Sequence, residues 1–152
     1  MDGFNLYRGY FVVSDTDPSG QKIKVKVNEK ACSIKITVEI TIFPKNQGVI
    51  SRNNINWNSL ANTIEQGIEN YWNGFQNSGG CDVFVDAIVH VDTSHTTYLF
   101  VDGGGQNEIQ ITDDPDHRSY VFGNSMGTWA GWETQQTFAH EAGHLMGLPD
   151  DY

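Results

Sequence analysis

Two histidines four residues apart, with a glutamate directly after the first, stand in the segment TFAHEAGHLMGLPDDY, Thr137 to Tyr152. On an α-helix, positions four apart differ by about 40° around the axis, so His140 and His144 would project from one face. Two imidazoles placed in this way suit one zinc ion. Glu141 lies about 100° around the helix from His140, which puts its carboxylate beside the metal rather than on it. The spacing predicts a metal site with an adjacent base.

A hydrolytic zinc site needs three protein ligands and one open position. Gly147 can adopt the left-handed conformation that ends a helix, and Pro149 stiffens the returning chain. Asp150 follows three residues after the glycine and is the expected third ligand. Asp151 is the alternative, although the spacing of glycine and proline favours Asp150. With Glu141 as general base, such a site would hydrolyse a peptide bond with the help of zinc.

Composition limits the classes of protein that this chain can belong to. Its 152 residues, 38% of them hydrophobic, suffice for one domain with a buried core. The formal net charge of −10 argues against a nucleic-acid partner. No apolar run reaches the roughly 18 residues of a membrane span, and the start MDGFNLYRGY lacks the features of a signal peptide. Cys32 and Cys81 could pair or stay reduced.

The first half of the chain predicts two strands and a helix. KIKVKV (Lys22 to Val27) and CSIKITVEITIF (Cys32 to Phe43) alternate polar and apolar residues, and the lysines of the first suggest an edge strand. A polar loop is expected from Pro44 to Asn56. A helix from Asn56 to Phe75 then shows helical spacing of its apolar residues, with Asn58 or Ser59 as cap and Gly74 at its end. The apolar positions are Leu60, Ile64, Ile68, and Tyr71 or Trp72.

The second half predicts more strands and the helix that carries the motif. CDVFVDAIVHVD (Cys81 to Asp92) is the clearest strand, and TTYLFVD (Thr96 to Asp102) and NEIQITD (Asn107 to Asp113) are shorter ones. SYVFGNSMGTWAGW (Ser119 to Trp132) is expected to be a strand broken by glycines. The final helix should run from about Thr134 to Leu145. This order favours an α+β fold in which two helices pack on a mixed sheet.

The segment HEAGHLMGLPD, His140 to Asp150, resembles the metzincin zinc-peptidase pattern H-E-x-x-H-x-x-G-x-x-H, with aspartate as the last residue. This variant resembles the snapalysin-type zinc endopeptidases, whose third ligand is an aspartate. The resemblance implies a zincin-like twisted mixed sheet with an active-site helix and a backing helix, here Leu60 to Trp72. It also implies that His140, His144 and Asp150 bind Zn²⁺ and that Glu141 is the general base.

Metzincins have a methionine turn beneath the zinc, after the third ligand. Met146 lies inside the motif and does not fit that role, so residues 21–152 are expected to be a zincin-like domain truncated before this turn. The alternative is an inactive remnant that acts as a non-enzymatic binding module with a structural metal.

A second resemblance lies at the other end of the chain. NLYRGYFVVSDTDPSG, Asn5 to Gly20, resembles the end of an RHS-repeat core, in which D-P-x-G marks the junction with a variable toxin. Residues 1–20 would then be the junction, and residues 21–152 a toxin payload exported as part of a larger protein. The partners implied are a protein or peptide substrate and a cognate immunity protein, without nucleic acid or membrane.

Other residues are weaker candidates. Trp129 and Trp132 could line a substrate cleft, although a place in the core is the simpler expectation. The acidic segment DDPDH, Asp113 to His117, lacks the regular pattern of a calcium loop and is expected to be a solvated turn. The remaining histidines lack a partner at ligand spacing and are expected to be surface or hydrogen-bonded residues: His90, His95 and His117.

Overall fold

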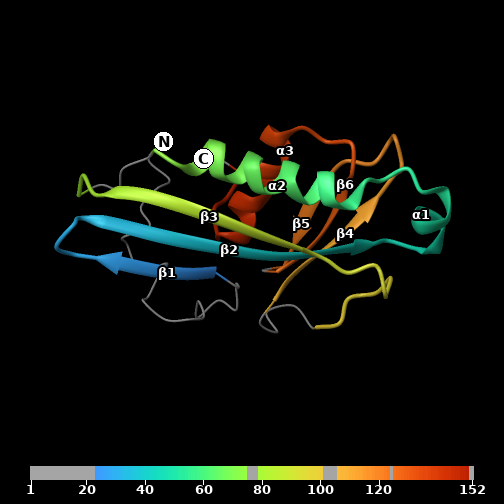
Figure 1. The fold of residues 1–152 in the computed structure, drawn as a ribbon, viewed down its shortest axis with the longest axis horizontal. Helices are drawn as coiled ribbons and strands as arrows, with labels where there is room; N and C mark the ends of the chain where they lie inside the picture. The colour runs from blue at the N-terminus through green and yellow to red at the C-terminus, as the bar shows by residue number, and fades with distance from the viewer. Residues whose placement is uncertain (1–22, 75–78, 101–105, 124, 151–152) are drawn as a thin grey trace.

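The computed structural model describes residues 23–74, 79–100, 106–123 and 125–150 (Figure 1). These residues form one mixed sheet of six strands with three helices, which confirms the predicted α+β class. The strands are β1 (Ile23–Asn28), β2 (Ser33–Pro44), β3 (Asp82–Val91), β4 (Asn107–Thr112), β5 (Tyr120–Phe122) and β6 (Met126–Ala130). The helices are α1 (Gln47–Arg52), α2 (Trp57–Trp72) and α3 (Gln135–Leu145). The RHS-like segment, residues 5–20, lies outside the described residues.

The long strand β2 is the centre of the sheet. Strand β3 runs parallel to it along one side. On the other side, β1 pairs antiparallel with the first half of β2, and β4 pairs parallel with its second half. Strand β6 continues the sheet parallel to β4, and β5 closes it antiparallel to β6. Strands β1, β3 and β5 therefore have one strand neighbour each and form the edges of the sheet.

The core lies between the sheet and the helices α2 and α3. Alternate residues of β2 are buried, as the period of two predicts: Ile34, Ile36, Val38, Ile40 and Ile42. The apolar stripe of α2 meets the core through Leu60, Ile64, Ile68 and Trp72. Trp72, rather than Tyr71, is fully buried, and its indole N–H donates to the Ala139 carbonyl of α3 at 2.9 Å.

A glycine sets the distance between α2 and α3. A Cβ at Gly67 would lie 2.7 Å from the Gln135 carbonyl oxygen, closer than real Cβ contacts. The two helices can therefore approach closely only because this position has no side chain. Together with the Trp72 hydrogen bond, this contact makes α2 a backing helix that positions α3.

The outer side of β3 is covered by polar side chains of α2, which runs alongside it (Figure 1). Three residues spaced four apart on α2 and its cap bind backbone groups of β3 that no strand reaches. Asn73 exchanges two hydrogen bonds with Val85 (2.8 and 2.9 Å), Glu69 accepts from the Ala87 N–H (3.1 Å), and Glu65 accepts from the Val89 N–H (2.9 Å). Helix α2 thus satisfies an edge that would otherwise invite pairing with another chain.

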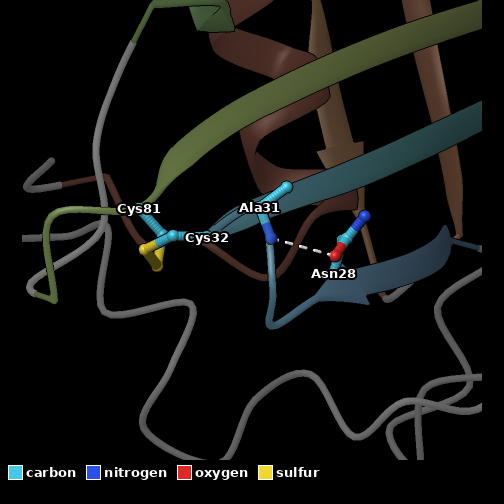
Figure 2. Close-up of a disulfide and its surroundings, with 4 residues drawn as sticks. All are labelled: Asn28, Ala31, Cys32 and Cys81. Atoms are coloured by element: carbon cyan, nitrogen blue, oxygen red, sulfur yellow. Dashed lines mark hydrogen bonds between the residues drawn. A yellow bond between two sulfur atoms is a disulfide. The ribbon is translucent and has the colours of Figure 1, made fainter.

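A disulfide joins Cys32 to Cys81 just before β2 and β3 begin (Figure 2). The hairpin turn before Cys32 is stabilised by the Ala31 N–H, which donates to the Asn28 side chain at 3.1 Å. The disulfide therefore links the start of the edge strand β3 to the start of the central strand β2. A disulfide is compatible with an extracellular or secreted protein. No helix within the described ranges is long and apolar enough to cross a membrane.

Three predictions about the elements were wrong in part. The expected loop from Pro44 to Asn56 contains the short helix α1, because Asn46 caps it by accepting from the Val49 N–H at 3.1 Å. The cap of α2 is Asn56, which accepts from the Ser59 N–H at 3.1 Å; neither Asn58 nor Ser59 is the cap.

The third error concerns the strand expected from Thr96 to Asp102. Residues 96–100 form a loop instead, and 101–102 are not described. The buried Glu108 side chain accepts from the backbone N–H groups of Leu99 and Phe100 at 2.9 and 3.0 Å. These N–H groups thus donate to a side chain rather than to the backbone of a neighbouring strand.

The segment from Ser119 to Trp132 is more ordered than a broken strand. It forms β5 and β6, which pair antiparallel with Val121 opposite Gly127. Gly123 lies at the end of β5 with φ of +63°, a value that favours glycine. The hairpin brings β5 to the edge of the sheet that lies beside α3.

Candidate metal centre

Helix α3 follows the strand β6 in the chain and carries the histidine motif. Thr134 caps it, since its side chain accepts from the Thr137 N–H at 3.2 Å. One face of the helix is buried against the sheet and α2 through Phe138, Ala139, Ala142 and Leu145. His140 and His144 lie on the remaining face, partly exposed, as the spacing predicts.

The two histidines and one aspartate bring metal-binding atoms together. The imidazole rings of His140 and His144 have centroids 4.9 Å apart. The Nε2 atoms of His144 and His140 lie 3.0 and 3.7 Å from Asp150 Oδ1. All three donor atoms lie within 4.8 Å of one another, a group that could hold a metal ion.

A helix-ending turn delivers Asp150 to the histidines. Gly147 is left-handed with φ of +87°, and the Leu148 N–H donates to the Gly143 carbonyl at 2.9 Å. This is a Schellman turn, which needs a residue without a side-chain penalty at the left-handed position. Pro149 follows, and Asp150 lies beside both rings. The alternative ligand, Asp151, lies outside the described residues.

The same turn fixes the orientation of one imidazole. The Nδ1–H of His144 donates to the Leu148 carbonyl at 2.8 Å, because a carbonyl oxygen can only accept. The Nε2 atom, which faces Asp150, is then the nitrogen available as a ligand. Hydrogen bonding of the second ring nitrogen is the usual way in which proteins orient a metal-binding histidine.

The donor set fits zinc in type and in number. Two imidazole nitrogens and one carboxylate oxygen are ligands that zinc accepts. The Asp150 side chain is 90% exposed and that of His140 is 44% exposed, so the three donors are open to solvent on one side. Three protein donors with an open side are typical of a catalytic zinc site, whereas structural sites are closed by four ligands.

Glu141 lies next to this group but differs from it in environment. Burial raises the pKa of its carboxyl group above the ordinary value, and the nearby Asp150 charge raises it further. The charges of His144 and Arg118 and the backbone N–H of Val121 act in the opposite direction. The carboxylate thus lies at the boundary between the core and the candidate ligands, with β5 beside it.

A hollow of about 540 Å³, here called the site hollow, opens over these residues. It is lined by the motif, by the turn that follows α3, and by the segment Arg118–Val121 with Gly123. A second, smaller hollow of about 360 Å³, the side hollow, shares Arg118, Ser119, His140 and Glu141 with the first. The candidate ligands therefore line a depression that is open to solvent.

Neither tryptophan proposed for the cleft lines the site hollow. Trp129 is fully buried beside Phe138, which agrees with a place in the core. Trp132 is 54% exposed, and its indole N–H donates to the Asp114 carbonyl at 2.9 Å. Trp129 is therefore a core residue, as expected, whereas Trp132 belongs neither to the core nor to the lining of the site hollow.

The residues of β5 and the arginine before it were not predicted to belong to the site. Arg118, Tyr120 and Val121 reach the site hollow because the β5–β6 hairpin folds back beside α3. No local pattern signals this, since it depends on residues far apart in the chain. The glycines at 123 and 127 were the available sign that this segment was a hairpin.

The other histidines and the acidic segment agree with their simpler interpretations. Each histidine has a hydrogen-bond partner outside the site: His90 with Glu39, His95 with Thr97 and His117 with Thr128. Both oxygens of Asp113 accept from the Arg52 guanidinium at 2.6 Å. Asp114 and Asp116 are exposed, as expected of a solvated turn, whereas this ion pair leaves the Asp113 side chain only 8% exposed.

No family model, curated protein or solved structure matches the chain. The resemblance to metzincins therefore rests on His140 to Asp150 and on the coarse order of elements. Any function must be argued from the geometry of the site.

Proposed function

We propose that the chain is a zinc-dependent endopeptidase domain in which His140, His144 and Asp150 bind the metal and Glu141 is the general base. The observation that carries the proposal is the convergence of three donor atoms within 4.8 Å in the lining of the site hollow. Coincidence of residue types is a poor explanation, because a left-handed glycine and a histidine–carbonyl hydrogen bond both serve to bring Asp150 to the rings.

A zinc ion held by these donors would supply a Lewis acid that polarises a carbonyl and lowers the pKa of water. The remaining chemistry belongs to the chain itself. Glu141, one residue from the first ligand, accepts the proton of the attacking water and passes it to the leaving amine. The Val121 backbone N–H favours the charged carboxylate, which is the form that can act as a base. Strand β5 forms the wall of the hollow along which a peptide would lie.

The geometry favours catalysis over the alternative of a structural metal in a non-enzymatic module. A structural zinc is normally enclosed by four protein ligands. Among the described residues, the group has three, and its side toward the site hollow is open. A buried base beside such an open position has no purpose in a structural site.

The wider proposal is that this domain is the toxin payload of an RHS-type polymorphic toxin. It is supported by the resemblance of residues 5–20 and is compatible with the disulfide, which suits an exported protein. The expected partners are a protein substrate and a cognate immunity protein. Sequencing the gene upstream tests this proposal, because RHS repeats should precede residue 1.

The substitution Glu141→Gln tests the hydrolase most simply. It keeps the size of the side chain and the three donors, so zinc content should stay unchanged while cleavage of casein falls at least 100-fold. Glu39→Gln, on β2 and paired with His90, is a matched control that should leave both unchanged. Cleavage by Glu141→Gln at the wild-type rate would refute Glu141 as the base.

A further inference from the structure

Arg118 is held at the edge of the site hollow by its two neighbours. The His117 ring bonds to the Thr128 carbonyl at 3.2 Å, and the Ser119 hydroxyl accepts from the Ala130 N–H at 2.9 Å. Both bonds anchor the segment to β6. Arg118 itself lines both the site hollow and the side hollow. Its two neighbours thus hold the segment against β6, while Arg118 borders the space in front of α3.

The location of Arg118 relative to the proposed ligands follows from the two hollows. The side hollow contains Arg118, His140 and Glu141, but neither His144 nor Asp150. Arg118 therefore adjoins His140 and Glu141 in both hollows, and it shares the site hollow with His144 and Asp150. Its positive charge reaches Glu141, where it opposes the effect of burial on the pKa of the carboxyl group.

Arg118 is available to bind a ligand. Within the described ranges it forms no ion pair and no hydrogen bond of its side chain, and the residue is exposed. The other arginine of that part of the chain, Arg52, has both guanidinium nitrogens occupied by Asp113. In a chain of net charge −10, Arg118 is thus an exposed cation whose side chain has no ion pair or hydrogen bond in the described ranges and which lies beside the proposed metal ligands.

We propose that Arg118 determines substrate specificity by binding a carboxylate close to the scissile bond, an inference that rests on the proposed peptidase function. A guanidinium offers two parallel N–H donors that match a carboxylate, and this pairing discriminates against a neutral amide. Asp150 would be engaged by the metal and Glu141 by proton transfer, so Arg118 is the charged residue of the hollow that remains for the substrate. The carboxylate belongs to an acidic side chain or to the end of the peptide.

Cleavage of a mixed peptide pool by the zinc-loaded chain, read by mass spectrometry, tests the proposal. The wild-type protein should cut preferentially beside Asp or Glu, or near a free carboxyl terminus. Amidation of the carboxyl termini removes only the second preference, so a parallel amidated pool distinguishes the two sources. Arg118→Gln should lose the preference, and Arg118→Lys should retain part of it, because lysine keeps the charge without the two-pronged geometry.

Kinetics on the best peptide and its amide counterpart separate recognition from a catalytic role. For wild type, replacing the carboxylate by an amide should lower kcat/KM about tenfold or more, chiefly through KM. For Arg118→Gln the two peptides should be equal. An equal fall of kcat on all peptides, with the preference retained, would overturn the proposal and assign Arg118 to the chemistry.

A binding experiment keeps this inference separate from the proposed function. Zinc-loaded Glu141→Gln protein, which should not turn over, is immobilised and exposed to carboxylate-bearing and fully amidated pools. Selective retention of the first pool, lost in Arg118→Gln/Glu141→Gln, supports carboxylate binding by Arg118 even if wild type cleaves nothing and the peptidase proposal fails. Equal retention of both pools by Glu141→Gln would overturn it.

Discussion

Two edge strands of the sheet, β3 and β5, both have a helical carboxylate beside their backbone N–H groups, but the two edges differ in how much of their backbone is covered. Along β3, Glu65, Glu69 and Asn73 bind backbone groups at regular spacing, and the disulfide holds the start of the strand. Along β5, a single carboxylate interacts with one backbone N–H, and it belongs to the motif helix. The first edge is closed by its helix, whereas the second borders a hollow.

The comparison shows that a helical carboxylate beside a backbone N–H can either cover the edge of a sheet, as at β3, or lie beside a candidate site, as at β5. A carboxylate that accepts from an edge strand in a closed layer replaces a missing strand. The Glu141 carboxylate instead lies between the core and the proposed metal ligands, where burial raises its pKa. Ionisable side chains whose pKa is shifted by burial and by nearby charges are concentrated at functional sites. The two edges can therefore be perturbed independently.

Removal of the disulfide should have the largest effect on the closed edge. The bond joins residues 49 positions apart, so Cys32→Ser/Cys81→Ser should lower the free energy of unfolding by about 4 kcal/mol. Denaturant titration with and without reductant measures the loss, and the double variant should not respond to reductant. Stability of the wild type that is equal under both conditions would show that the bond contributes nothing.

Removal of the α2 carboxylates that cover β3 should have the next largest effect on the free energy of unfolding. Glu65→Ala/Glu69→Ala removes two charged acceptors from the Val89 and Ala87 N–H groups, and should cost about 2–4 kcal/mol in total. The exposed edge should also promote self-association, which sedimentation velocity detects. Glu65→Gln/Glu69→Gln keeps the acceptor oxygens and is the matched control. A monomeric alanine variant of wild-type stability would contradict the role given to α2.

Tyr98 tests the sheet near the open edge with a smaller effect. Its hydroxyl donates to the carbonyl of Gly127, which pairs with Val121 of β5. Burial raises the pKa of Tyr98 to about 12, so the folded protein favours the neutral phenol. The contribution of Tyr98 to the free energy of unfolding should be intact below about pH 10, the pKa of tyrosine in the unfolded chain. It should be lost as the pH rises toward about 12, the pKa in the folded protein.

The variant Tyr98→Phe should cost about 1 kcal/mol at neutral pH. Because it removes the ionisable group, its stability should fall less than that of wild type above about pH 10. Thermal unfolding across this range, with ultraviolet titration of the tyrosines, provides the measurement. Parallel curves for the two proteins would exclude Tyr98 as the source of the change.

The sequence was informative where a local pattern determines structure. The alternation of Ile34 to Ile42 identified the central strand, and the spacing of His140 and His144 placed both rings on one helix face. Gly147 and Pro149 signalled the turn that brings Asp150 to them. These features depend on neighbours within a few residues, so one sequence suffices to predict them.

Features that depend on distant residues were missed. The strand expected at Thr96 is a loop because Glu108 binds its backbone, which no local pattern reveals. Arg118 reaches the site only through the pairing of β5 with β6. Glu65 and Glu69 look like an ordinary solvated helix face in the sequence, although both bind β3. Topology, rather than propensity, decides what these side chains contact.

Titration of zinc into the metal-free protein, followed by calorimetry, tests the central claim most directly. Wild type should bind one ion per chain. Binding should be weakened at least tenfold by Asp150→Asn and by His144→Ala and should be unchanged in His90→Ala. Asp151→Asn should also bind as wild type does, which decides between the two aspartates. Wild-type affinity in a His140→Ala/His144→Ala double variant would contradict the site.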